Sequence, residues 1–112
     1  INPVRDGVYE RSQPDEGLIH SLEHGRIWIS YKSSIPDAAK ERLRSLVRSE
    51  VRVILTVRDQ NDSDVALAAW TRLDTFNLAP EGSFDEGRIR DFINRYRDKG
   101  PEYIPAMTGK EY

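Results

Sequence analysis

The period of the apolar residues changes abruptly at Val51, and this change limits the fold more than any other feature of the sequence. Residues 36–50 follow the spacing of a helix with one buried stripe, made of Ala39, Leu43, Leu46 and Val47. Residues 51–58 instead alternate as in a half-buried strand, with one face made of Val51, Val53, Leu55 and Val57. A helix that leads directly into a strand predicts a domain in which helices pack on a sheet.

A shorter helix and a strand are expected ahead of this pair. Pro14 suits the first turn of a helix, Ser12 is a candidate cap, and Gly25 would end the helix. The apolar residues of this segment cluster on one side of the helix: Leu18, Ile19 and Leu22. Residues 26–31 are rich in β-branched and aromatic side chains, which favours a strand.

The remaining chain predicts one more strand and one more helix. Residues 65–73 would form the third strand, joined to the strand before it by a short polar connection in an antiparallel hairpin. Ser83 and Glu86 have the spacing of a capping box for a last helix, which Gly100 would end.

The resulting order is helix, strand, helix, strand, strand, helix over a single domain of residues 1–112. It predicts an α+β fold with a small mixed three-stranded sheet. We expect a right-handed crossover between the first two strands and helices on at least one face of the sheet.

The composition excludes several classes of protein. The 112 residues contain no cysteine, so disulfides, thiolate catalysis and cysteine zinc sites are ruled out. A net charge of -2 argues against a nucleic-acid partner, because such domains usually carry a basic excess. The sequence has no run of about twenty apolar residues, so we expect no membrane-spanning segment in this chain. Composition says nothing of a protein partner.

Both histidines of the chain lie in one short motif, His20 and His24, with Glu23 between them. On a helix the two rings lie one turn apart on one face, largely opposite the apolar side. Imidazoles at this spacing predict a site for copper or zinc, in which Glu23 would orient a ligand or modulate the site. Met107, the only methionine, is an outside candidate because a thioether favours Cu(I).

Two other interpretations of the histidine motif stay open. His24 suits the negative end of a helix dipole and His20 could pair with Glu16, so the histidines could serve a hydrogen-bond network in an interaction or structural domain without metal. The pattern H-x-x-E-H is also that of inverted zinc proteases, in which the glutamate activates water and Glu102 or Asp74 would add a carboxylate. A domain of this size leaves little room for a peptide groove, so a small metallohydrolase is kept as the third alternative and no catalytic residue is assigned.

Four stretches of the sequence together resemble a known family. They are Gly7-Val8-Tyr9, the run His20-Ser21-Leu22-Glu23-His24-Gly25 with the strand that ends in Tyr31, Ala68-Ala69-Trp70-Thr71-Arg72 in an expected strand, and residues 89–96 followed by Gly100-Pro101-Glu102. With these motifs the chain resembles the bacterial family called domain of unknown function 3105.

The resemblance implies a location more than an activity. Members of that family look like exported or singly membrane-anchored proteins, which implies an extracytoplasmic domain, periplasmic or at the cell surface. The chain would then be the soluble part of a longer protein with an N-terminal signal or anchor. Many members also carry a segment of proline, serine, glycine and histidine before the Gly-Val-Tyr match. A third histidine ligand would then precede Ile1.

Overall fold

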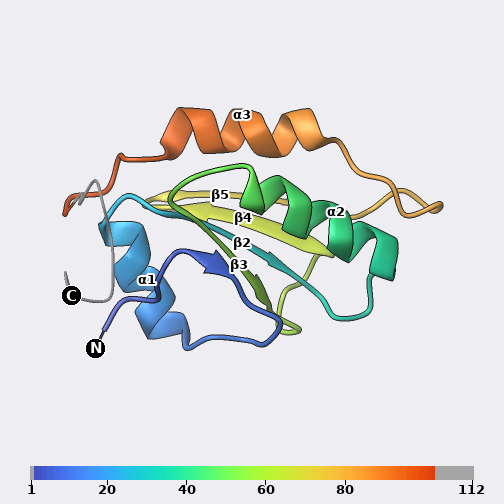
Figure 1. Ribbon diagram of the computed structural model, residues 1–112, viewed down its shortest axis with the longest axis horizontal. Coiled ribbons are helices and arrows are strands. Elements are labelled where there is room, and N and C mark those ends of the chain that lie inside the picture. The colour runs from blue at the N-terminus through green and yellow to red at the C-terminus, as the bar shows by residue number, and fades with distance from the viewer. Residues whose placement is uncertain (1, 103–112) are drawn as a thin grey trace.

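The computed structural model describes residues 2–102, which fold into a five-stranded sheet covered by helices on both faces (Figure 1). The helices are α1 (Asp15–Glu23), α2 (Asp37–Arg48) and α3 (Glu86–Tyr96). The strands are β1 (Gly7–Val8), β2 (Ile27–Tyr31), β3 (Val53–Val57), β4 (Val65–Ala69) and β5 (Arg72–Phe76). The α+β class is confirmed. The expected three-stranded sheet is wrong in its strand number, because β1 and β5 also join the sheet.

The strands lie in the order β1-β3-β2-β4-β5. β1, β3 and β2 run parallel to one another, β4 is antiparallel to β2, and β5 is antiparallel to β4. The expected hairpin between the strands at 51–58 and 65–73 is therefore wrong, since β4 pairs with β2. The reason is burial: residues Val53 to Thr56 are buried on both faces, which is typical of a central strand. Val51 precedes the strand and is 58% exposed.

The segment at 65–73 is not one strand. Trp70 and Thr71 form a tight turn between β4 and β5, and Thr71 has a φ of 66°. The sequence predicts a strand there because tryptophan and threonine both favour β structure, whereas turns are usually marked by glycine or asparagine.

The two faces of the sheet have different cores. Inward residues of β2, β3 and β4 pack against α2 and α3 in one continuous apolar cluster, in which the stripe expected on residues 36–50 is confirmed. The opposite face carries α1 and a small cluster of Val4, Leu18 and Ile54. Figure 1 shows α2 and α3 on one side of the sheet and α1 on the other.

The helix starts differ from the expected caps. Pro14 precedes α1 with no side-chain cap, so Ser12 does not cap this helix. The N-cap of α3 is Asp85, which accepts a hydrogen bond from the Arg88 amide at 3.2 Å. The expected capping box of Ser83 and Glu86 is therefore wrong, because the cap is Asp85, two residues after Ser83. An aspartate caps as well as a serine does, and the closer one is used.

One apolar residue of the first helix is also misplaced by the sequence prediction. Leu18 and Leu22 are buried, but Ile19 is 49% exposed. Ser21 is buried instead of Ile19. The Ser21 hydroxyl can be buried because it donates a hydrogen bond to the carbonyl oxygen of Val4 at 2.6 Å. The side of α1 that meets the sheet is therefore partly polar.

Candidate metal site

The last turn of α1 is held by a segment far away in the sequence, residues 97–102, which we call the C-terminal strap. The Asp98 amide donates to the carbonyl of Gly25 at 2.8 Å, and the Glu102 amide donates to the carbonyl of Glu23 at 2.7 Å. Helix C-termini leave carbonyl groups without helical partners. The strap satisfies two carbonyls at this end of the helix and brings its own side chains beside α1.

Gly100 makes this close approach possible. A Cβ atom at this position would collide with the carbonyl oxygens of Glu23 and Leu22 and would lie 2.6 Å from the Gly25 nitrogen. Only glycine leaves that space for another backbone. The sequence predicts Gly100 as the end of the last helix, but α3 ends at Tyr96 and the glycine serves the strap.

Three possible ligands converge at this junction: His20, Glu23 and Glu102. Their ligand atoms all lie within 4.8 Å of one another. His20 and Glu23 are three residues apart on α1 and half-buried, and Glu102 is exposed on the strap. One imidazole and two carboxylates form a donor set that suits a divalent transition ion.

His24 lies beside this group in a different environment. Its side chain is only 8% exposed, and its Nδ1 atom is 2.5 Å from the carbonyl oxygen of Glu102. A carbonyl can only accept, so Nδ1 carries the proton. The His24 ring stacks on the His20 ring with centroids 4.8 Å apart and planes inclined by 28°. His24 thus links the strap to the second histidine, and its role as a metal ligand stays a prediction.

A buried arginine, for which the sequence gives no signal, contacts the backbone of His24. Arg26 is fully buried, and its Nη1 donates to the carbonyl of His24 at 3.0 Å. Its Nε donates to Asp6 at 3.1 Å. Burial raises the pKa of Asp6 above its usual value, although Arg26 acts in the opposite direction. Arg26 therefore ties the end of α1 to the chain just before β1.

A second ion pair fixes the strap. Arg52 donates to both carboxylate oxygens of Asp98, at 2.7 Å and 3.0 Å. Both residues have left-handed backbone conformations, with φ of 58° for Arg52 and 67° for Asp98. Such conformations cost energy in residues other than glycine, so a two-point ion pair between them stabilises a strained junction.

The remaining residues considered from the sequence fall into three places. Glu102 lies at the site. Asp74 lies on β5, outside the group of three, and pairs with Arg88 of α3 at 2.7 Å. Met107 lies outside the described residues, so its predicted role has no structural counterpart. Sequence signals for Arg26, Asp6 and the strap are absent, since their contacts join segments that show no local pattern.

The site combines a helical histidine, a neighbouring carboxylate and a strap carboxylate on an α+β scaffold. Residues 2–108 match the family described as "Protein of unknown function (DUF3105)", so the chain belongs to that family. No curated protein and no solved structure matches the chain. Among residues 2–102, no helix is long and apolar enough to cross a membrane.

Proposed function

We propose that this domain binds one divalent transition ion, with zinc as the first candidate, through His20, Glu23 and Glu102. The observation that carries the proposal is the convergence of these three side chains within 4.8 Å. Ligand atoms around a tetrahedral zinc lie roughly 3.4 Å apart, given bond lengths near 2.1 Å. Small rotations of the exposed Glu102 side chain and of Glu23 would close the set, with water as a fourth ligand.

The donor types favour zinc over reduced copper. The site offers an imidazole nitrogen and carboxylate oxygens, and no sulfur ligand lies among the described residues at this site. Cu(I) prefers thiolate and thioether ligands, whereas imidazole together with carboxylate suits Zn²⁺ and also Cu²⁺. A copper site that includes Met107 is the alternative. The extracytoplasmic location implied by the family is a further part of the proposal.

In this proposal the two histidines have different tasks. His20 is half-buried and belongs to the convergent group, so it supplies the ligand. His24 is buried and bonded to the strap, so it orients Glu102 and supports the His20 ring from one side. The same contacts of His24 favour the second candidate function, a metal-free domain in which the histidines only fix the fold.

The grouping favours binding over hydrolysis. In the inverted protease pattern both histidines hold the ion and the glutamate is left to activate water. Here Glu23 is itself one of the three convergent side chains, and His24 faces the backbone of Glu102. A ligand set that uses the glutamate leaves no general base at the equivalent position.

Titration of the metal-free protein with Zn²⁺ and with Cu²⁺ by calorimetry tests the proposal. We expect one zinc per chain, lost in His20→Ala and weakened at least tenfold in Glu23→Gln and Glu102→Gln. Glu81→Gln, in an exposed loop, is the matched control and should bind as the unaltered protein does. His24→Ala should lower the melting temperature even without metal. Equal zinc binding by the unaltered protein and His20→Ala would rule out this ligand set, and no metal binding by the unaltered protein would support the metal-free candidate.

A further inference from the structure

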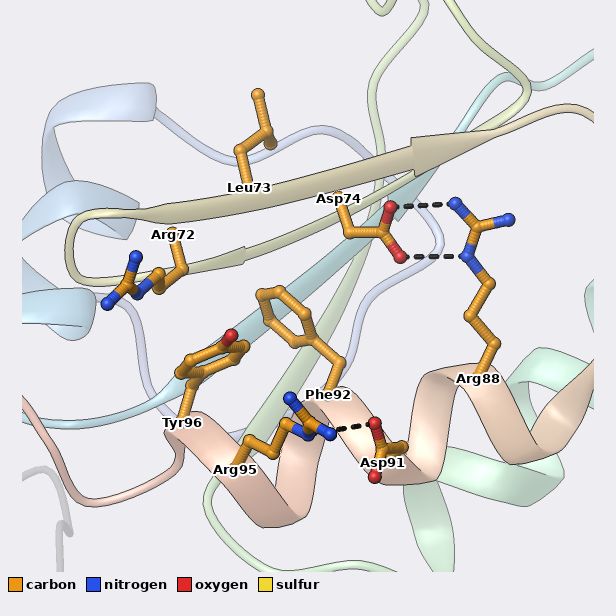
Figure 2. Close-up of a pocket in the computed structure, with 8 residues that line it drawn as sticks. All are labelled: Arg72, Leu73, Asp74, Arg88, Asp91, Phe92, Arg95 and Tyr96. Carbon is orange, nitrogen blue, oxygen red and sulfur yellow. Dashed lines mark hydrogen bonds and ion pairs between the residues drawn. The ribbon is translucent and has the colours of Figure 1, made fainter.

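The edge strand β5 has one open side and lies beside a groove. In the described part of the chain β5 pairs only with β4, and a groove of about 390 Å³ separates β5 from α3. Figure 2 shows Arg72 and Asp74 on the side of β5 that faces α3, and Leu73 on the opposite side. Leu73 is 71% exposed, which is more than Ile19 and Val51, the other exposed large apolar residues between positions 2 and 102.

The register of the hairpin determines which backbone groups of β5 face outward. Ala69 pairs with Arg72 across a turn of two residues, so this pair exchanges hydrogen bonds. The pattern then alternates, and the backbone groups of Leu73 and Thr75 point away from β4. The Arg88 guanidinium supports this assignment, because its Nη2 donates to the outward carbonyl of Thr75 at 3.3 Å. Arg88 thereby occupies the Thr75 carbonyl, whereas the backbone N–H and C=O groups of Leu73 have no partner within residues 2–102.

The side chains around Leu73 in one copy of the chain are complementary to the same side chains in a second copy. If a second β5 strand lies antiparallel with the two-fold axis at Leu73, Leu73 meets its own counterpart and Arg72 lies opposite Asp74 of the second copy. Arg72 has no carboxylate partner among residues 2–102; its guanidinium lies 5.5 Å above the Tyr96 ring. Opposite charges on directly paired residues stabilise a sheet.

The neighbouring register is disfavoured by the same rule. An axis at Asp74 would place two aspartates opposite each other and would require the Thr75 carbonyl that Arg88 occupies. Asp74 can serve two arginines in the first register, because a carboxylate accepts several hydrogen bonds and its bonds from Arg88 take only part of that capacity. Charge and backbone geometry therefore select one arrangement.

We propose that a second copy of this chain docks on β5, so that two sheets join into one across a two-fold axis at Leu73. A two-fold axis of this kind gives a closed dimer, with the same patch used by both copies. The contact consists of few residues, so the dimer forms in a concentration-dependent way. The dimer is independent of the metal site, since none of its residues belongs to that site.

Cysteine cross-linking tests this arrangement, because the natural sequence has no cysteine. A disulfide needs Cα atoms about 4.4–6.8 Å apart, and residues directly opposite on paired strands meet that condition. We expect Leu73→Cys to form a covalent dimer under mild oxidation much faster than Thr75→Cys, which lies on the same face of β5. Val51→Cys, at 58% exposure, is the control for random collision. Equal rates at the three positions would overturn the proposal.

Sedimentation velocity over a concentration series gives the independent measurement. The unaltered protein should move from monomer towards dimer as its concentration rises. Leu73→Lys should remain monomeric with an unchanged circular dichroism spectrum, because the side chain is exposed in the single chain. Arg72→Asp should also weaken the dimer, since it places aspartates opposite each other. A protein that stays monomeric throughout, or a dimer that persists in Leu73→Lys, would rule out this surface.

Discussion

The two faces of the sheet are held by different kinds of interaction. On the face covered by α2 and α3 the buried residues form one continuous apolar cluster. On the α1 face the apolar cluster has three buried members, and the burial there includes Ser21, Arg26 and Thr56. Apolar packing is tolerant of small shifts, whereas hydrogen bonds and ion pairs fix direction and distance. The candidate metal site lies where polar contacts position the backbone.

As a result, one face of the sheet mainly stabilises the fold, and the other mainly positions chain segments. The α2 and α3 face supplies most of the apolar area removed from water, and so most of the driving force for folding. The α1 face supplies fewer apolar contacts but fixes three chain segments together: the residues before β1, the end of α1 and the strap. Variants on the two faces should therefore differ in both magnitude and kind.

The largest effect is expected from Leu43→Ala on α2. Leu43 is fully buried in the large cluster, so the variant leaves a cavity and should lower the free energy of unfolding by about 3 kcal/mol. Urea denaturation followed by circular dichroism measures this change. Ile19→Ala on α1 is the control, and a comparable loss there would contradict the contrast between the faces.

A smaller and more local effect is expected from Ser21→Ala. The Ser21 hydroxyl lies 2.6 Å from the Val4 carbonyl oxygen and 3.0 Å from that of Gly17, and its loss should cost about 1 kcal/mol. The N-terminal segment should loosen with it, which faster hydrogen exchange of the Val4 amide would report. Ser45→Ala, exposed on α2, should change neither quantity. Unchanged exchange at Val4 would show that apolar contacts alone hold this segment.

The smallest effect concerns pH and has opposite signs on the two faces. On the α3 side, hydrogen bonds from Arg88 hold the pKa of Asp74 below its usual value. Its contribution to stability is thus present above the unfolded pKa and is lost as pH falls through the folded one. Asp74→Asn should cost under about 1 kcal/mol at neutral pH and nothing in strong acid.

Asp6, beside the α1 face, gives the opposite dependence. Burial raises the pKa of its carboxyl, so folding favours the protonated form. The stability that this group contributes is present in acid and is lost as pH rises through the folded pKa. Urea midpoints of Asp74→Asn and Asp6→Asn, measured against the unaltered protein in strong acid and at neutral pH, should therefore diverge in opposite directions. Parallel curves would contradict the assignment.

The sequence predicts the local part of this fold. The stripe on α2 and the short strand β2 follow from residue spacing and propensity, because each is decided within a few residues. The strand order is decided by partners far apart in the chain, which no local pattern records. β1 has only two residues, so it has no periodicity to detect, and Trp70 lies in a turn although it favours strands.

The candidate site divides in the same way. His20, Glu23 and His24 could be identified from spacing because one helix carries them. Glu102 could be named only as one of two possible carboxylates, since spacing in sequence does not bring it to α1. The role of Gly100 could not be read from the sequence. A glycine before proline is typical of a helix end, and equally of a backbone that passes another backbone at close range.

The strap also determines when, during synthesis of the chain, the residues of the candidate site can first meet. The contact between His24 and Glu102 joins residues 78 positions apart, so during synthesis both histidines leave the ribosome long before their carboxylate partner. Closing so long a loop has an entropic cost that only the finished sheet can offset. A nascent or shortened chain therefore presents both histidines without Glu102, and the proposed metal site could form only after residue 102 has been synthesised.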